Sequence, residues 1–367
     1  MKKIRLVLVG GFLGSGKTTL LYGAARTLIS RGMRVGLVTN DQAPGSVDTR
    51  LLAERGLDVR EVGGSCFCCN FPGLLRNAGK LRKDVNADLI LLEPVGSCTD
   101  LSATVLQPLK DRFRKEFILS PLSVLADPFR LRQLLSGTRR TSRRGPNYIL
   151  RKQLEEADLI LIGKADLLDG NGRKELRRLV SGAFPGVPVR TISPVSGAGL
   201  SGWLETVLTS SRAGVKIAEV DYDVYAEGEA AMGWLNADLT LKTRGCCIPD
   251  WRMLCLFVMR EIKQVLERKR ANVGHVKTLL TANGRHCAAN LTRLGGPIDL
   301  HGELGDDTTR VRMTVNARVE MPPKDLERIV IASLESVIGN RLRVTVHKVH
   351  TLRPARPCPT FRYAKPV

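Results

Sequence analysis

Aromatic residues make up only 5% of this 367-residue chain, and no apolar run approaches the roughly 20 residues that would span a bilayer. The few aromatic residues do not alternate with the basic runs, so the pattern expected for stacking on nucleic-acid bases is missing. The apolar start Met1–Gly10 lacks a small-residue cleavage site, and a glycine-rich loop follows it directly. We therefore expect a first β-strand rather than a signal peptide, in a cytoplasmic protein that does not enter a membrane.

Positive charge is abundant, with 57 Lys and Arg against 36 Asp and Glu and a formal net charge of +21. Denser patches occur at Arg139-Arg140, Arg143-Arg144 and Arg268-Lys269-Arg270. Such a surface can bind nucleic acid or an acidic partner. It can also be a solvated surface produced by a general arginine bias, which the scarcity of aromatic residues favours.

Short apolar strands alternate with helical stretches from residue 4 to about residue 208. This alternation predicts an α/β fold, a doubly wound and mostly parallel sheet covered on both faces. A helix is expected at Lys17–Ser30, ending at Arg31-Gly32. The expected strands, all rich in Val, Ile and Leu, are Ile4–Val9, Arg34–Thr39, Asp58–Val62, Asp88–Glu93, Leu122–Ala126, Asp158–Ile162 and Val187–Ile192.

The pattern breaks at 211–225, which we interpret as a linker between a domain at 1–210 and a smaller α+β domain at 226–352. The segment 353–367, with four prolines, is expected to be an extended tail. The smaller domain is predicted to be an antiparallel sheet with helices on one side, ferredoxin-like or similar. Its expected helices are 254–266 and 326–337, and its expected strands are 234–242, 274–281, 286–292, 311–319 and 342–346.

The segment Gly11-Phe12-Leu13-Gly14-Ser15-Gly16-Lys17-Thr18 matches the Walker A pattern, with an apolar strand before it and a helix after it. Its glycines let the backbone turn so that N–H groups point at phosphate oxygens, and the helix N-terminus adds its positive end. Lys17 is expected to reach the β- and γ-phosphates, and the Thr18 hydroxyl to ligate magnesium. The sequence thus predicts a P-loop nucleotide hydrolase whose phosphate-binding residues are Gly11, Gly14, Ser15, Gly16, Lys17, Thr18 and Thr19.

Two carboxylates are candidates for the magnesium ion and the attacking water. Glu93 ends an apolar strand at the edge where ligands of such sheets bind, and it can hold magnesium or position the water. Asp48 lies in a loop after the second strand and can respond to the γ-phosphate through magnesium; a plain surface turn is the alternative. We assign catalysis to Lys17, Glu93 and Asp48.

Base selection is assigned to Gly163-Lys164-Ala165-Asp166, where GTPases usually carry Asn-Lys-x-Asp. The aspartate accepts hydrogen bonds from guanine N1 and N2, which adenine cannot supply, so Asp166 favours GTP over ATP. The stem of Lys164 is expected to cover the ring, whereas Gly163 lacks the side chain of the usual asparagine. Ser193, after the next strand, lies where a backbone amide normally contacts guanine O6.

Three of the nine cysteines, Cys66, Cys68 and Cys69, fall within four residues of one loop. In a cytoplasmic chain this bunching indicates a metal before a disulfide. Thiolates on both sides of one residue can bind a single soft metal, and the adjacent cysteine can be a third ligand. Zinc is the default; copper(I), cobalt or nickel are alternatives, as is a small buried apolar turn without metal. The pair Cys246-Cys247 is interpreted as packing.

The order of these motifs resembles the CobW-type GTPases, relatives of the UreG and HypB metallochaperones. The chain has Walker A, the pair Asn40-Asp41 with a later aspartate, Cys-x-Cys-Cys, Glu-x-x-Gly and x-Lys-x-Asp, over about residues 1–210. The resemblance implies GTP-driven delivery of a metal ion to a client protein or cofactor pathway, and it suggests a homodimer. It implies nucleotide or magnesium binding by Lys17, Thr18, Glu93, Lys164 and Asp166, and metal binding by Cys66, Cys68 and Cys69.

The chain departs from this family pattern in three ways. Ser65 stands where glycine usually precedes the first cysteine, and Glu93-Pro94-Val95-Gly96 replaces Glu-Thr-Thr-Gly. Only five histidines occur, scattered where the family often has histidine-rich stretches. We therefore expect this chain to belong to a divergent branch, so that the client proteins of the family cannot be assigned to it. A nucleic-acid-associated NTPase and a small-molecule P-loop kinase remain alternative functions.

Cys98 lies five residues after Glu93, in the loop expected to move with the γ-phosphate. If the Cys66–Cys69 loop comes close, Cys98 can be a fourth thiolate that is available in only one nucleotide state. The alternative is a loop thiol without a ligand role.

Overall fold

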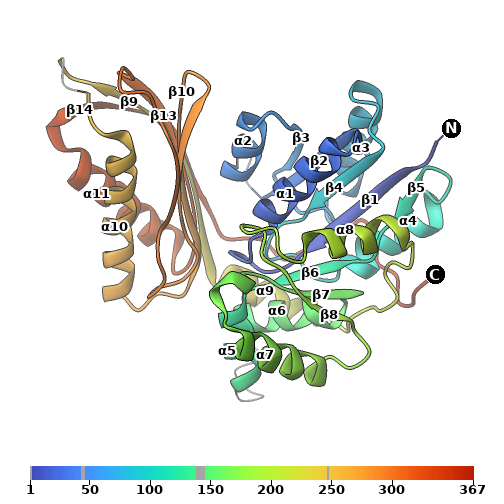
Figure 1. The fold of residues 1–367 in the computed structure, drawn as a ribbon. Helices are drawn as coiled ribbons and strands as arrows, with labels where there is room; N and C mark the ends of the chain where they lie inside the picture. The colour runs from blue at the N-terminus through green and yellow to red at the C-terminus, as the bar shows by residue number, and fades with distance from the viewer. Residues whose placement is uncertain (1, 43–45, 138–144, 246–247) are drawn as a thin grey trace. The chain divides into compact units, whose positions relative to one another are not determined.

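A computed structural model describes residues 2–42, 46–137, 145–245 and 248–367. The chain divides into two compact units, each assembled from separate segments (Figure 1). The first comprises Met1–Pro44, Gly56–Gly228 and Arg356–Val367, and the second Gly45–Arg55 and Glu229–Ala355. The segment 211–225, where the sequence suggests a linker, belongs to the first unit. The arginines at 139–140 and 143–144 and the pair Cys246-Cys247 lie outside the described residues.

The first unit is built on a parallel sheet, as the sequence predicts. Within the described residues it has eight strands in the order β3-β2-β4-β1-β6-β7-β8, with β5 also paired to β1. All seven expected strands are present, and the short β5 is an addition. The strands are β1 (Ile4–Gly10), β2 (Val35–Asp41), β3 (Asp58–Gly63), β4 (Leu89–Glu93), β5 (Phe117–Leu119), β6 (Ser123–Ala126), β7 (Leu159–Ile162) and β8 (Val189–Thr191).

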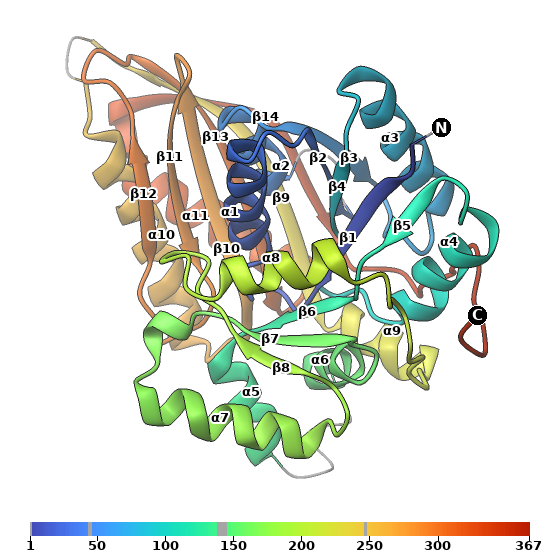
Figure 2. The same ribbon diagram turned by 45° about the vertical axis from the view of Figure 1, so that its right-hand side comes forward.

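Helices cover both faces of this sheet, so its central strands are apolar throughout (Figure 2). Residues Leu89–Leu92 of β4, for example, are each at most 1% exposed. Parallel strands all end at the same edge, so the loops that follow them lie together there. The helices are α1 (Lys17–Ser30), α3 (Phe71–Asp84), α4 (Gln107–Arg112), α5 (Pro128–Ser136), α6 (Gly145–Glu155), α7 (Gly170–Ala183), α8 (Leu200–Thr209) and α9 (Tyr222–Ala230), with a 3-10 turn at Ala165–Leu167.

A π-helical turn, Ser102–Leu106, precedes α4. The Ser102 carbonyl accepts from the amide of Gln107, five residues later rather than four. The neighbouring Ala103 carbonyl accepts from the amide of Tyr363, at 3.1 Å, in the C-terminal segment. Residues 353–367 contain no helix or strand, and from Arg356 onward they pack as part of the first unit.

The second unit is an antiparallel sheet with helices, which confirms the predicted α+β class; the ferredoxin-like assignment stays a prediction. Its six described strands follow the order β12-β11-β10-β13-β9-β14. They are β9 (Met232–Thr243), β10 (Val273–Ala282), β11 (Arg285–Leu291), β12 (Asp299–Glu303), β13 (Arg310–Glu320) and β14 (Leu342–Leu352).

Helices α10 (Trp251–Arg268) and α11 (Pro323–Ile338) share one apolar core with this sheet, including Leu280 and Cys287. Successive strand residues face opposite sides, and the neighbours Leu279 and Ala288 pack instead with Val47 of α2 (Val47–Glu54). An early segment of the chain thus completes the second unit. In the part of the chain that the structure describes, no helix is long and apolar enough to cross a membrane.

Candidate functional site

The phosphate loop joins β1 to α1 and requires its glycines. Gly11 has φ +134°, and a Cβ there would lie 2.1 Å from the carbonyl oxygen of Leu125. Gly16, with φ +98°, precedes the first residue of α1 in a left-handed conformation that glycine adopts without strain. The Ser15 hydroxyl is buried and has no hydrogen-bond partner among the described residues. A glycine-lined turn with an unsatisfied hydroxyl at a helix N-terminus fits a bound phosphate.

Lys17 and Thr18 occupy the positions that phosphate and magnesium chemistry require. Lys17 is 6% exposed, and its ammonium donates to the carbonyls of Gly11, at 2.8 Å, and Phe12, at 3.4 Å. It can exchange these oxygens for those of a phosphate. The Thr18 hydroxyl donates to Glu93 Oε1 at 2.9 Å, so the two side chains assigned to magnesium lie in contact. Thr19 is exposed on the first turn of α1.

The base-recognition segment after β7 packs against the phosphate loop. A Cβ on Gly163 would lie 3.3 Å from the carbonyl oxygen of Ser15, which leaves little room for the usual asparagine. Lys164, at φ +48°, pairs its ammonium with Asp127 at 2.8 Å. Asp166 accepts from the Ser193 hydroxyl at 2.5 Å. The structure thus brings Asp166 and Ser193 together. The contact is made by the Ser193 side chain with the aspartate, whereas the sequence suggested a backbone amide that contacts the base.

Asp48 belongs to α2 in the second unit. Both of its carboxylate oxygens accept from the Lys277 ammonium, at 2.6 and 2.7 Å. Neighbouring contacts fix the same helix, because the Val47 amide donates to Asn316 Oδ1 at 2.6 Å. The assignment of Asp48 to magnesium and water remains a prediction.

The three clustered cysteines form a tight turn between β3 and α3. The amides of Cys69 and Asn70 both donate to the Cys66 carbonyl, and the Asn70 side chain caps α3 by accepting from the Gly73 amide at 3.0 Å. The sulfur–sulfur distances are 2.8 Å for Cys66–Cys68, 3.2 Å for Cys66–Cys69 and 3.8 Å for Cys68–Cys69. Ligands of a tetrahedral zinc ion, with Zn–S bonds near 2.3 Å, lie about 3.8 Å apart. The Cys68–Cys69 distance equals this value, whereas Cys66 would have to move away from both neighbours to share one ion with them. The three sulfurs are close enough together to be a candidate site for one soft cation.

The thiols share their protons unequally. Hydrogen-bonding contacts with the thiols of Cys68, Cys69 and Cys98 hold the pKa of the Cys66 thiol well below its usual range. The contact with Cys66 raises the pKa of Cys68 well above that range and the pKa of Cys69 to about 11. Cys66 is therefore the thiol of the cluster that loses its proton most readily, and a bound cation would displace the protons of the others.

Asn40, at the end of β2, holds the cysteine turn in place. Its amide nitrogen donates to the carbonyls of Val62, at 2.6 Å, and Ser65, at 2.7 Å, and its oxygen accepts from the Phe67 amide at 2.8 Å. The sequence shows the Asn40-Asp41 pair but does not by itself indicate this role. A polar side chain at the end of a buried strand next to the cysteine-bearing strand was the available signal.

The C-terminal segment also crosses the cysteine turn, which the sequence did not indicate. The Cys358 amide donates to the Cys69 sulfur at 3.3 Å, and the Thr360 amide donates to the Cys68 carbonyl at 2.8 Å. The Phe361 ring packs on Phe71, the first residue of α3, with 5.4 Å between ring centroids. These contacts shield the solvent side of the turn.

A buried acidic pair, Asp100 and Glu156, lies in and beside the loop that follows β4. Asp100, at φ +64°, accepts from the Tyr222 hydroxyl at 2.8 Å and pairs with Arg362 at 2.7 Å. Glu156 accepts from the Ser102 amide at 2.8 Å. Burial raises the pKa of Glu156 to about 8, with the nearby charge of Asp100 acting in the same direction. Glu156 is therefore largely protonated at neutral pH.

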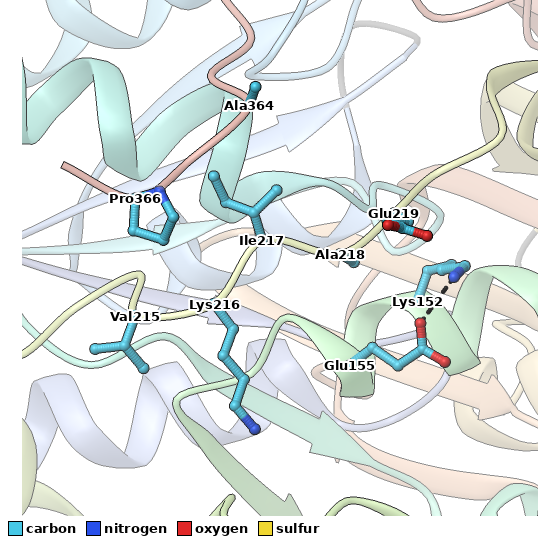
Figure 3. Close-up of a pocket in the computed structure, with 9 residues that line it drawn as sticks. All are labelled: Lys152, Glu155, Val215, Lys216, Ile217, Ala218, Glu219, Ala364 and Pro366. Atoms are coloured by element: carbon cyan, nitrogen blue, oxygen red, sulfur yellow. Dashed lines mark hydrogen bonds and ion pairs between the residues drawn. The ribbon is translucent and has the colours of Figure 1, made fainter.

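A separate surface hollow of about 480 Å³ lies between α6, the segment 215–219 and the C-terminal residues Ala364 and Pro366 (Figure 3). The ion pair of Lys152 and Glu155, at 2.8 Å, lies at its side. None of its lining residues belongs to the phosphate loop, the base-recognition segment or the cysteine turn. We do not assign it to the nucleotide or the metal.

Comparison with known proteins agrees with these motifs. A model of the CobW/HypB/UreG nucleotide-binding domain matches residues 5–190. The zinc chaperone YeiR of Escherichia coli is 30% identical over 183 residues, covering 47% of this chain and 50% of that protein. The zinc chaperone CobW of a Sinorhizobium species is 27% identical over 208 residues, covering 49% and 56%. The chain thus spans about half the length of these relatives.

Solved structures of similar proteins include HypB from Helicobacter pylori in complex with nickel. It is 17% identical, covers 57% of this chain and 88% of its own, and has a TM-score of 0.42. The Zn(II)-bound YjiA GTPase of E. coli is 16% identical, covers 91% and 99%, and has a TM-score of 0.36. From the match of the family model to half of its length, the chain belongs to the CobW/HypB/UreG nucleotide-binding family.

Proposed function

We propose that this protein binds and hydrolyses GTP and uses the reaction to bind and deliver a zinc ion held by Cys66, Cys68 and Cys69. One observation carries the proposal: a complete phosphate loop and a three-thiol cluster with two buried members follow strands of the same parallel sheet. Two relatives that are named zinc chaperones support zinc as the metal. A client protein that receives the ion, a homodimer and a cytoplasmic location remain parts of the proposal.

In the nucleotide site, the amides of the phosphate loop and the Lys17 ammonium bind the phosphates. The Thr18 hydroxyl and Glu93, already 2.9 Å apart, hold magnesium directly or through water. Asp166 accepts from the guanine edge and thereby rejects adenine, which lacks those donors. Bound GTP supplies the phosphoanhydride bond that water cleaves. Glu93 or Asp48 orders that water. Turnover is expected to be slow without a partner, because an arginine that stabilises the negative charge of the transition state has not been identified among the many arginines of the chain.

The metal site is thiolate-rich, which suits a cation that must be held and then released. Cys66 and Cys68 are 5% and 2% exposed, whereas Cys69 is half-buried. A cysteine thiol must lose its proton to bind zinc. Zinc binding therefore releases protons and weakens at low pH. A reducing compartment keeps these side chains as thiols, in agreement with the proposed cytoplasmic location.

The test uses protein purified without oxygen, in three forms: the parent, Lys17→Ala, and a triple variant with Cys66, Cys68 and Cys69 replaced by serine. Cys255→Ser, a buried cysteine of the second unit, is the control. Bound zinc per chain and the hydrolysis of GTP and ATP are measured for each. We expect Lys17→Ala to lose hydrolysis and keep zinc, and the triple variant to lose zinc and still bind GTP.

Two results would refute the proposal: undiminished hydrolysis by Lys17→Ala, or unchanged zinc content in the triple variant. The alternative functions give different outcomes in the same preparation. A small-molecule kinase transfers the phosphate to an acceptor instead of releasing inorganic phosphate. A nucleic-acid-associated NTPase binds DNA or RNA with an affinity that falls steeply with salt.

A further inference from the structure

Cys98 brings a fourth thiol to the cysteine turn from a different part of the chain. It lies in the loop after β4 and is fully buried. Its thiol is in hydrogen-bonding contact with those of Cys66 and Cys68, the two buried members of the turn. Cys69 lies on the opposite, half-exposed side, where its sulfur accepts from the Cys358 amide. Cys98 therefore approaches the turn from the side of Cys66 and Cys68, away from Cys69.

We propose that Cys98 is the fourth ligand of the zinc ion, so that the site is a closed four-thiolate centre. This inference rests on the proposed zinc site of Cys66, Cys68 and Cys69. Closed zinc sites in proteins almost always have four protein ligands in a tetrahedron, and the turn alone supplies three. Cys98 lies on the buried side of the turn, where it can supply the fourth ligand from within the protein.

The backbone of Cys98 is held in a fixed position. Its amide donates to the Val95 carbonyl at 2.9 Å, and its carbonyl accepts from Gln153 Nε2 at 2.7 Å. The same side-chain nitrogen of Gln153 donates to the Gly96 carbonyl at 3.1 Å. With its main chain anchored on α6, Cys98 presents its sulfur to the cysteine turn without a large loop movement. This preorganisation is what a metal ligand requires.

The loop that carries Cys98 also contacts the nucleotide site. It starts at Glu93, whose carboxylate accepts from Thr18. It then passes Gly96, where a Cβ would lie 3.0 Å from the backbone nitrogen of Leu13 in the phosphate loop. Cys98 is thus the thiol ligand whose loop touches the nucleotide site, so a change in that loop when the γ-phosphate is lost would alter zinc binding through this one thiolate.

The experiment counts sulfur ligands on the full-length protein by zinc K-edge X-ray absorption. We expect four sulfur atoms at about 2.3 Å in the parent and three in Cys98→Ser. The zinc affinity of Cys98→Ser, from competition with a chelator, is expected to fall by at least the roughly 10- to 100-fold that loss of an outer-shell partner costs. Cys98→Ala, with a smaller side chain, should behave in the same way. Cys358→Ser is the matched control, and it should keep four sulfurs and the parent's affinity.

Three sulfurs in the parent, or an unchanged affinity in both Cys98 variants, would overturn the assignment while leaving the three-thiol site intact. Loss of a sulfur in Cys358→Ser would place the fourth ligand in the C-terminal segment and would also overturn it. A parent that binds no zinc through Cys66, Cys68 and Cys69 would refute the proposed function itself. Because the parent's spectrum needs no substitution, a misfolded variant does not block the test.

A second measurement tests the link to the nucleotide. Zinc affinity is compared with GDP and with a non-hydrolysable GTP analogue bound. The parent should differ between the two states, and Cys98→Ser should not. A variant that retains the parent's full difference would overturn the coupling role of Cys98.

Discussion

Replacing the buried Glu156 by glutamine should change how the stability of the first unit depends on pH. Glu156 is fully buried beside Asp100, and burial raises its pKa to about 8 from an ordinary value of 4.5. A carboxyl group whose pKa is higher in the folded state binds its proton more tightly there. It therefore stabilises the fold fully below pH 4.5, and this stabilisation is lost as the pH rises towards 8.

The size of the effect follows from the shift in pKa. Each unit corresponds to about 1.4 kcal/mol, so the free energy of unfolding should fall by on the order of 5 kcal/mol between pH 4.5 and 8. Above pH 8 this group adds no further change. Glutamine keeps an oxygen that accepts from the Ser102 amide, at 2.8 Å in the parent, but it has no proton to lose. The variant should lack this part of the pH dependence.

Hydrogen exchange followed by mass spectrometry, on peptides that cover residues 98–106, measures the effect where it arises. After correction for the intrinsic exchange rate, protection in the parent should decrease between pH 5 and 8 and then level off, whereas Glu156→Gln should stay flat. Glu155→Gln is the control, because Glu155 forms surface ion pairs with Arg151 and Lys152. Identical pH profiles for the parent and Glu156→Gln would refute the reasoning.

Three further substitutions have defined outcomes. Gly11→Ala should abolish GTP binding in calorimetry, because its Cβ would overlap a backbone oxygen at 2.1 Å; binding within twofold of the parent would contradict this. Asn40→Leu removes three hydrogen bonds from the cysteine turn and should lower zinc affinity by about 10- to 100-fold in chelator competition, with GTP binding retained. Asp238→Asn weakens the ion pairs of Arg50 and Arg312 in the second unit. The free energy of unfolding, measured with urea, should fall by about 1–2 kcal/mol, a value reduced because these side chains are partly exposed. An unchanged free energy of unfolding would show that solvent screens these pairs.

The sequence predicted the parallel sheet well because buried parallel strands are continuous apolar runs. The strand Asp58–Val62 and the helix Lys17–Ser30 lie where they were expected. The two added strands have weaker patterns. β5 has only three residues, and β12 has no buried residue among its five, so neither produces an apolar repeat.

Part of the candidate site was also predictable, because the phosphate loop and the cysteine turn are local motifs with fixed spacing. Contacts between distant segments were not. Asp48 and Lys277 are 229 positions apart, and nothing in the residues around Asp48 indicates a lysine partner. The sequence suggested a role for Cys98 only if its loop came close to the cysteine turn, and it did not predict that approach. It depends on where β3 and β4 lie in the sheet, with β2 between them, and not on spacing along the chain.

The π-helical turn at Ser102–Leu106 leaves one carbonyl for a distant partner. In a π turn a carbonyl accepts from the amide five residues later, and for Ala103 that residue is Pro108, which has no N–H. The Tyr363 amide donates to this carbonyl instead. A single proline in a helix thus provides the attachment point for a remote stretch of backbone. Replacing Pro108 by a residue that has an amide N–H would make the helix compete with that stretch for the same oxygen.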